Sequence, residues 1–257
     1  MKTKSLSFIG GGRIARIFLQ AFANRNFEFQ SVMVFDTNIE VSKALQLQFP
    51  QIGISESIEQ AAEYPTIFIA LHPPVIMEVL NKIAGIVSGD ALVISLAPKI
   101  TIEKIGSKLK TMNIARMIPN ATSYINEGYN PVTFAPGFAK YEKEKLLELL
   151  QLSGKTFEVA ENKLEAYALL SAMLPTYFWF QWNELTKLGT QMGLSEAESK
   201  DSVQQTLLAA NNLMFKSGLS PEQVMDLIPV KPIGDHQSEI CEFYQSKLLG
   251  LYEKIKP

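Results

Sequence analysis

Three consecutive glycines near the start of the chain form its clearest chemistry-bearing pattern. The apolar run Ser5–Ile9 leads into Gly10–Gly12, and the small residue Ala15 follows. A strand, a Gly-x-Gly-x-x-Ala turn and a helix in this order are typical of a dinucleotide-binding fold. In this interpretation Gly10 permits the tight turn, Gly12 lets backbone approach a pyrophosphate, and the helix N-terminus faces the phosphates with free amides. The expected contacts are Gly10, Gly12, Arg13 and Ile14.

An acidic residue, Asp36, follows the second apolar run, Ser31–Phe35. At this place a carboxylate accepts hydrogen bonds from the ribose hydroxyls of the cofactor and repels a 2′-phosphate. The sequence equally allows Asp36 to cap a turn with Thr37 and Asn38, because Asp and Asn favour such positions. We therefore expect NAD or NADP as cofactor, with NAD slightly favoured, and Arg13 could blunt that preference.

Two further runs end in residues expected beside the cofactor. The run Thr66–Leu71 is followed by His72 and two prolines, and the run Ala91–Leu96 is followed by small residues. Ligands of open parallel sheets lie beyond the carboxyl ends of the strands. His72 could act as an acid, but a lone histidine beside prolines is more often an ordinary loop residue, so no catalytic residue is assigned. The expected cofactor contacts here are Leu71, His72, Pro73 and Ala97.

The secondary structure that would position these residues differs between the two halves of the chain. The first half alternates short apolar runs with amphipathic segments, the pattern of parallel strands joined by crossover helices. From about Phe157 onward helical patterns replace it, and Ser195 with Glu198 and Ser220 with Gln223 each fit a capping box. We predict an α/β fold: a Rossmann doubly wound parallel sheet in residues 1–158 and an all-helical domain in residues 159–257. The expected strands are Ser5–Ile9, Ser31–Phe35, Thr66–Leu71, Ala91–Leu96 and Asn113–Ile118.

Composition narrows the function classes. The 257 residues carry a formal net charge of -2 with acids and bases interspersed, which favours a small-molecule substrate over nucleic acid or a membrane surface. The single cysteine, Cys241, cannot form an internal disulfide and fits the reducing cytoplasm. The charged start Met1–Lys4 precedes an apolar run that Ser7 and the glycines interrupt, so we expect no secretion signal. No metal site is expected.

The most apolar stretch, Leu169–Trp182, is too short for the roughly 20 residues of a membrane span and contains Pro175. It predicts a buried core helix. Its aromatic part, Tyr177–Trp182, is apolar on all sides of a helix, which indicates burial all round. Contact between subunits is favoured over a substrate cage, because interfaces are enriched in Trp, Tyr and Phe.

Several segments, in order, resemble the pyrroline-5-carboxylate reductase family. Ala115–Thr122, followed by Glu127-Gly128, is similar to the family's Arg-x-Met-Pro-Asn-Thr-Pro and Gly-Glu-Gly, and Ala70–Pro73 is similar to its Ala-Val-Lys-Pro. Ser95–Ala97 with Ile100–Ile102 matches Ser-Ile-Ala-Ala-Gly-Ile-Thr-Ile. The resemblance implies a Rossmann domain, a helical dimerisation domain, NAD(P)H as hydride donor and reduction of a cyclic imine to an amino acid such as proline. It adds Asn120 to the expected cofactor contacts.

The same resemblance places the substrate in the helical half, where this sequence departs from the family. Where the family has Leu-Ser-Gly-Ser-Gly-Pro-Ala-Tyr, the chain has Leu170–Tyr177, with Ala172–Leu174 in place of the Gly-Ser-Gly. The family's Ser-Pro-Gly-Gly-Thr-Thr loop, usually contributed by the partner subunit, corresponds to Lys231–His236. Both threonine hydroxyls are replaced there, by Asp235 and His236, and Asp235 would repel a carboxylate. The expected substrate contacts are Ser171, Thr176, Lys231, Gly234 and His236, although Lys231 and His236 could equally be solvated loop residues.

The sequence is also compatible with two other functions. The altered segments Ala172–Leu174 and Asp235-His236 would also suit a catalytically silent relative that binds a dinucleotide and acts as a regulator or scaffold. A hydroxyacid dehydrogenase is less well supported, because no helix-borne lysine stands near Leu169, where such a family would place its acid.

The aromatic run predicts a homodimer, or an assembly of dimers, built through the helical half. A monomer exposing Tyr177, Phe178, Trp179 and Trp182 together would carry a larger apolar patch than soluble monomers normally do. Light scattering at micromolar concentration should give twice the mass of the chain or an even multiple of it. A well-behaved monomer would contradict the prediction.

Overall fold

The computed structural model describes residues 5–257, so the Met1–Lys4 segment judged for a secretion signal lies outside the described residues. The chain divides into two compact units, one running to Met173 and including Tyr252–Pro257, the other comprising Leu174–Leu251. The division falls after Met173, later than the boundary expected after residue 158. The reason is that Leu164 and Ala168 pack against Ile118 of the sheet unit.

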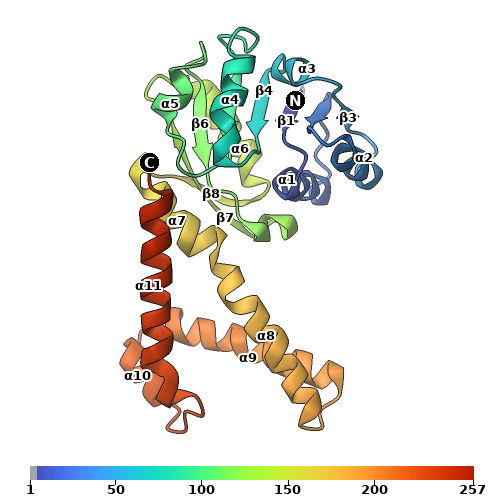
Figure 1. Cartoon of the computed structure of the whole chain (residues 1–257). Helices are drawn as coiled ribbons and strands as arrows, with labels where there is room; N and C mark the ends of the chain where they lie inside the picture. The colour runs from blue at the N-terminus through green and yellow to red at the C-terminus, as the bar shows by residue number, and fades with distance from the viewer. Residues whose placement is uncertain (1–4) are drawn as a thin grey trace. The chain divides into compact units, whose positions relative to one another are not determined.

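The first unit is built on an eight-stranded sheet with the order β3-β2-β1-β4-β5-β6-β7-β8 (Figure 1). All neighbours pair in parallel except β6 and β7, which pair antiparallel. The first six strands have the order of a Rossmann fold. The chain adds β2 and β3 on one side of β1 and then adds β4, β5 and β6 on the other side, so the order of the strands reverses between β1 and β4. The strands are β1 (Leu6–Ile9), β2 (Val32–Phe35), β3 (Gly53–Ile54), β4 (Thr66–Ile69), β5 (Leu92–Ser95), β6 (Ile114–Met117), β7 (Gly128–Phe134) and β8 (Gly154–Glu158).

The five strands expected from the sequence are present within one or two residues at each end, and three others were missed. β3 has only two residues and therefore gives no pattern. β7 contains Pro131, and prolines are rare within sheets because they cannot donate to the ladder. β8 is the edge strand beside β7, and its five residues are too few to show a clear alternation of apolar and polar side chains.

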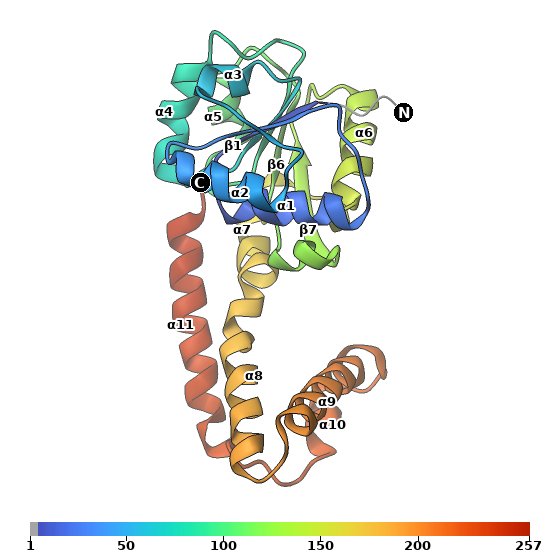
Figure 2. The same ribbon diagram turned by 90° about the vertical axis from the view of Figure 1, so that its right-hand side faces the viewer.

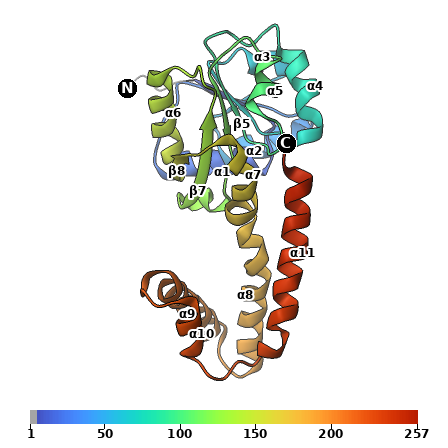
Figure 3. The same cartoon turned by 90° about the vertical axis from the view of Figure 1, so that its left-hand side faces the viewer.

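Helices cover both faces of the sheet, as the crossover connections require. Buried residues of α1 (Arg13–Asn24), α2 (Ile39–Gln48) and α6 (Lys140–Gln151) join the core on one face. Those of α3 (Ile58–Ala62), α4 (Pro73–Ile83) and α5 (Ile102–Gly106) join the core on the other. Figures 2 and 3 show α4 and α6 on opposite sides of the strands.

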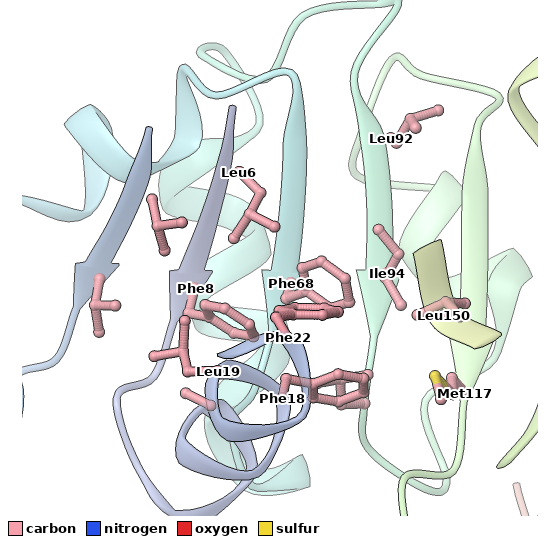
Figure 4. Packing of buried hydrophobic residues seen from close by; sticks show 14 of the residues in the cluster. Leu6, Phe8, Phe18, Leu19, Phe22, Phe68, Leu92, Ile94, Met117 and Leu150 are labelled. Carbon is pink, nitrogen blue, oxygen red and sulfur yellow. The ribbon is translucent and has the colours of Figure 1, made fainter. Parts of the chain in front are cut away.

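Phenylalanines dominate the core beneath the glycine turn. Phe8 on β1, Phe18 on α1 and Phe68 on β4 are fully buried. The ring centroids of Phe8 and Phe68 lie 5.0 Å apart, and those of Phe18 and Phe68 lie 5.5 Å apart (Figure 4). This packing fixes α1 on the two central strands and so fixes the direction of the helix that follows the glycines.

The second unit is all-helical, as expected. Both predicted capping boxes are present, at Ser195 with Glu198 and at Ser220 with Gln223. The expectation of a buried core helix at Leu169–Trp182 is wrong for this chain by itself. The segment is divided between a π-helical turn, η3 (Ala168–Ala172), and α8, and no residue of α8 is buried. The helices are α8 (Leu174–Gln191), α9 (Glu196–Lys216), α10 (Pro221–Asp226) and α11 (Gln237–Ile255), with the short η4 (Gly234–His236) before α11. The last turn of α11, from Tyr252, belongs to the first unit.

Replacing Phe68 by Ala should lower the free energy of unfolding by about 3–5 kcal/mol, because the substitution removes a buried ring from a cluster that cannot close the gap. Urea unfolding of the two proteins measures the difference. Leu47→Ala is the control, since Leu47 is 85% exposed and its loss should change the free energy by less than about 0.5 kcal/mol. Equal effects of the two substitutions would contradict this account of the core.

Candidate functional site

The sheet brings most of the expected cofactor residues to one edge. Strands β2, β1, β4 and β5 are neighbours and run in parallel, so their carboxyl ends lie together. The glycine turn follows β1, Asp36 follows β2, Leu71–Pro73 follows β4 and Ala97 follows β5. This edge, on either side of the reversal point between β1 and β4, is where ligands of such sheets bind.

The geometry of the glycine turn fits a bound dinucleotide. Gly10 has a φ of +105°, and a Cβ built on it would lie 2.4 Å from the carbonyl oxygen of Ala70, so only glycine fits. A Cβ built on Gly12 would meet nothing within 4 Å, which leaves room for a phosphate beside the backbone. Ala15 is fully buried where α1 meets the sheet. The roles expected for the three small residues therefore agree with their surroundings.

The N-terminus of α1 offers its amides to a ligand. Gly12 is the N-cap and has no side chain to occupy them, and the first turn contains no acidic residue. Arg13 is exposed and Ile14 is half-buried. The free N–H groups and the dipole of this 12-residue helix favour an anion here. The residues thus fit the pyrophosphate of a nicotinamide dinucleotide.

Asp36 has the turn-capping role that the sequence allowed, and its binding of ribose hydroxyls stays a prediction. Its Oδ1 accepts a hydrogen bond of 2.9 Å from the amide of Asn38, which is the turn-capping role. Its Oδ2 accepts one of 2.9 Å from the amide of Gly11, which ties the end of β2 to the glycine turn. Each carboxylate oxygen has a second lone pair available, so these bonds leave acceptors for ribose hydroxyls.

The residues after β4 and β5 differ in what they can contribute. Leu71 packs against the glycine turn, with its Cδ2 3.1 Å from a Cβ built on Gly10. His72 is exposed and is the N-cap of α4, without a side-chain capping bond, and Pro73 is the first helical residue. Ala97 is buried. Contact of these residues with a cofactor stays a prediction, and no catalytic role is assigned to His72.

Asn120 is held by the protein itself. Its Oδ1 accepts hydrogen bonds from the amide and the hydroxyl of Thr122, and its Nδ2 donates to the carbonyl of Ser171 at 2.8 Å. The residue is 4% exposed. It orders the turn after β6 and joins that turn to η3, and contact with a cofactor stays a prediction.

The expected substrate residues are divided between the two units. Ser171 lies in the first, buried in η3, and its Oγ donates to the carbonyl of Tyr167 at 2.7 Å. Thr176 is exposed in the first turn of α8. Lys231, Gly234 and His236 lie in the second unit around η4, where His236 Nδ1 is 3.3 Å from Glu239 Oε2 and the histidine side chain is 70% exposed. Contact of these residues with a substrate stays a prediction.

Sequence reasoning missed a buried charge cluster at the end of β6. The Arg116 side chain is fully buried, with Nη1 2.7 Å from Glu161 Oε1 and Nη2 2.6 Å from Glu165 Oε1. The available signal in the sequence was Arg116 within the apolar run Ile114–Met117, together with Glu161 and Glu165 four residues apart. Glu161 and Glu165 are 45 and 49 residues from Arg116 along the chain, so no local pattern predicted that they pair.

Within residues 5–257, no helix has the length and the apolar character needed to cross a membrane. The same residues contain no group of three or more His, Cys, Asp or Glu side chains arranged to hold a metal ion.

Comparison with known proteins extends these findings. A family model described as "NADP oxidoreductase coenzyme F420-dependent" matches residues 5–99, and one described as "Pyrroline-5-carboxylate reductase dimerisation" matches residues 161–231. The chain is 24% identical to a pyrroline-5-carboxylate reductase of Corynebacterium melassecola over 252 residues, which cover 96% of this chain and 93% of that protein.

Solved structures share the fold along almost the whole chain. The Plasmodium falciparum pyrroline carboxylate reductase with NADP bound superposes with a TM-score of 0.77 at 21% identity, covering 99% of this chain and 96% of its own. The Streptococcus pyogenes 1-pyrroline-5-carboxylate reductase superposes with a TM-score of 0.78 at 18% identity, covering 99% and 97%. The resemblance to the pyrroline-5-carboxylate reductase family and the predicted fold class, a Rossmann sheet followed by a helical dimerisation domain, are thereby confirmed.

We predict that the protein uses NADH at least as well as NADPH, because the Asp36 carboxylate would repel a 2′-phosphate. Asp36→Asn should shift the ratio of kcat/KM for NADH over NADPH toward NADPH by about tenfold, the effect of about 1.4 kcal/mol of repulsion. Steady-state kinetics, or binding titrations if turnover is slow, measure the ratio with both cofactors. Glu40→Gln, an exposed carboxylate on α2, is the control. A preference for NADPH that Asp36→Asn leaves unchanged would mean that Asp36 only shapes the turn.

Proposed function

We propose that the protein is an NAD(P)H-dependent oxidoreductase that reduces a cyclic imine, either pyrroline-5-carboxylate to proline or a related small anionic substrate. The observation that carries the proposal is the glycine turn after β1. Gly10 is fixed against Ala70, Gly12 faces open space and the N-terminus of α1 has no capping side chain. The similarity to pyrroline-5-carboxylate reductases over 96% of the chain supports the same reaction class.

Hydride transfer needs little from side chains. The bound dinucleotide would supply the hydride, and the protein's contribution is to hold donor and acceptor about 3–3.5 Å apart and to exclude competing reactions. In this proposal the backbone of Gly10–Ile14 binds the pyrophosphate, Asp36 orients the ribose and Leu71–Pro73 lines the path toward the nicotinamide. Reduction of the imine also adds a proton to its nitrogen. Water can supply this proton, so the exposed His72 need not move it, and the lack of an assigned catalytic residue is no objection.

The expected substrate residues indicate that this protein binds its substrate differently from, or more weakly than, the pyrroline-5-carboxylate reductases it resembles. The Ser171 hydroxyl is used within its own helix by the carbonyl of Tyr167. His236 lies beside Glu239 and Asp235 precedes it, so the local charge around η4 suits an anionic substrate poorly. Lys231 is exposed beside Gly234 and is the available cation in this loop. We infer that a substrate carboxylate, if bound here, is held by Lys231 and backbone.

A dimer, or an assembly of dimers, is part of the proposal. No residue of α8, α10 or α11 is buried, and Ser199 is the one buried residue of α9. Large apolar side chains are exposed instead, including Phe180 at 67%, Phe215 at 78% and Phe243 at 60%. The match of residues 161–231 to a dimerisation family fits burial of these side chains against a second copy. We place the protein in the cytoplasm, where its free, exposed Cys241 would stay reduced.

A catalytically silent dinucleotide-binding regulator or scaffold is the second candidate. It is favoured by Ala172–Leu174, which replaces the flexible glycines that the family uses near its substrate, and by Asp235. Tight binding of NADH without turnover of any cyclic imine would select this alternative.

The unmodified protein should reduce pyrroline-5-carboxylate measurably but weakly. Losing two good hydrogen bonds to a charged group, at about 1.5–3 kcal/mol each, lowers kcat/KM by roughly two to four orders of magnitude relative to a family enzyme that keeps them. Replacing both Asp235 and His236 by Thr should raise kcat/KM, as followed by the oxidation of NADH.

Asp226→Thr removes an exposed carboxylate from α10 of the same unit and should leave the rate unchanged. Full activity of the unmodified protein would show that the altered loop is unimportant. No activity in any form, despite binding of NADH, would select the regulator.

A further inference from the structure

The buried cluster of Arg116, Glu161 and Glu165 is not explained by stability alone. Its guanidinium is fully buried, and the Glu165 side chain is 1% exposed. Among the described residues, Arg116 Nε and Glu165 Oε2 have no hydrogen-bond partner. Taking such charges out of water is strongly unfavourable, and apolar side chains of similar volume in their place are often as stable. An incompletely satisfied buried ion cluster therefore calls for another role.

The cluster holds the backbone that follows β5. Glu165 Oε1, which pairs with Arg116, also accepts the amide of Lys99 at 3.0 Å. Glu161 Oε1, the other partner of Arg116, accepts the amide of Ile102 at 2.8 Å. Both carboxylates thus connect the end of β6 to the segment Lys99–Ile102. Because the guanidinium is fixed in the sheet, it also fixes this segment.

The segment needs such support. Lys99 has a φ of +74°, a left-handed conformation that is unfavourable for a residue other than glycine. The hydrogen bond from its amide to Glu165 helps to hold it there. The segment starts two residues after Ala97, at the carboxyl edge of β5, and leads directly into α5.

We propose that Arg116, Glu161 and Glu165 are positioning residues for the nicotinamide half of the cofactor. In a sheet of this order the two halves of the dinucleotide lie on either side of the reversal point, and β5 belongs to the half opposite to β2 and Asp36. The ions act through the backbone of Lys99–Ile102 and need not touch the cofactor. The proposal rests on the proposed function as far as the dinucleotide is concerned, and not on the identity of the imine.

Glu161 offers the test that least disturbs the fold, since its side chain is 31% exposed and the buried pair of Arg116 with Glu165 survives its loss. Glu161→Ala removes the acceptor of the Ile102 amide, whereas Glu161→Gln keeps an oxygen there. Lys163→Ala, an exposed change in the same short helix, is the matched control. Ile102→Pro removes the donor instead, at the first position of α5, where proline is tolerated.

The readout is calorimetric titration of each full-length protein with NADH and with ADP-ribose, which lacks the nicotinamide. Glu161→Ala and Ile102→Pro should raise the Kd for NADH by about tenfold, or about 1.4 kcal/mol, and change the Kd for ADP-ribose by less than about twofold. Glu161→Gln and Lys163→Ala should bind both ligands like the wild type.

Equal weakening of both ligands, or no change in either, would overturn the positioning role, because a purely structural contribution does not distinguish the two. A wild-type protein that binds ADP-ribose and NADH equally would overturn it as well. A wild-type protein that binds neither would instead refute the proposed function, whatever the cluster does.

Discussion

Parallel pairing of β1 with a strand on each side is the constraint on which the candidate site depends. At the end of β1, the Gly10 amide donates to the Phe35 carbonyl at 2.8 Å, and the Ala70 amide donates to the Ile9 carbonyl at 2.8 Å. Backbone from three strands converges there, so the turn that follows is determined by neighbours that leave no room for a Cβ at Gly10. The direction of α1 is fixed by packing on the sheet, because Phe18 of α1 packs against Phe8 of β1 and Phe68 of β4. The anion-binding end of the helix is therefore placed by the core beneath it.

A second constraint acts at the other side of the reversal point. Arg116 stands on β6, on the same face as the buried Ile114, and brings a permanent charge into an apolar layer. That charge is tolerated because two glutamates, from segments after the sheet, reach it. The arrangement couples those segments to the backbone beyond β5. Packing thus shapes the edge of the sheet at β1 and β4, and buried ions hold the backbone beyond β5.

The two units differ in how they bury apolar surface. The sheet unit encloses two large clusters, one on each face of the sheet. The helical unit leaves most of its large apolar side chains exposed, and its helices are stabilised locally by caps such as Ser195 with Glu198. Marginal helices gain most of their stability from packing. Such a unit is stable when another surface covers it, which agrees with its match to a dimerisation family.

The sequence by itself determined what neighbouring residues encode. The strand-glycine-helix opening, the five strands β1, β2, β4, β5 and β6, and both capping boxes were predictable, because each depends on residues within a few positions of one another. The tertiary structure decided which distant groups meet. Arg116 with its glutamates, Asn120 with Ser171, and the contact between Asp36 and Gly11 depend on how the crossovers bring separate segments together. These hydrogen bonds carry no local periodicity, and burial strengthens them only after the sheet has closed around them, so no pattern along the chain reveals them.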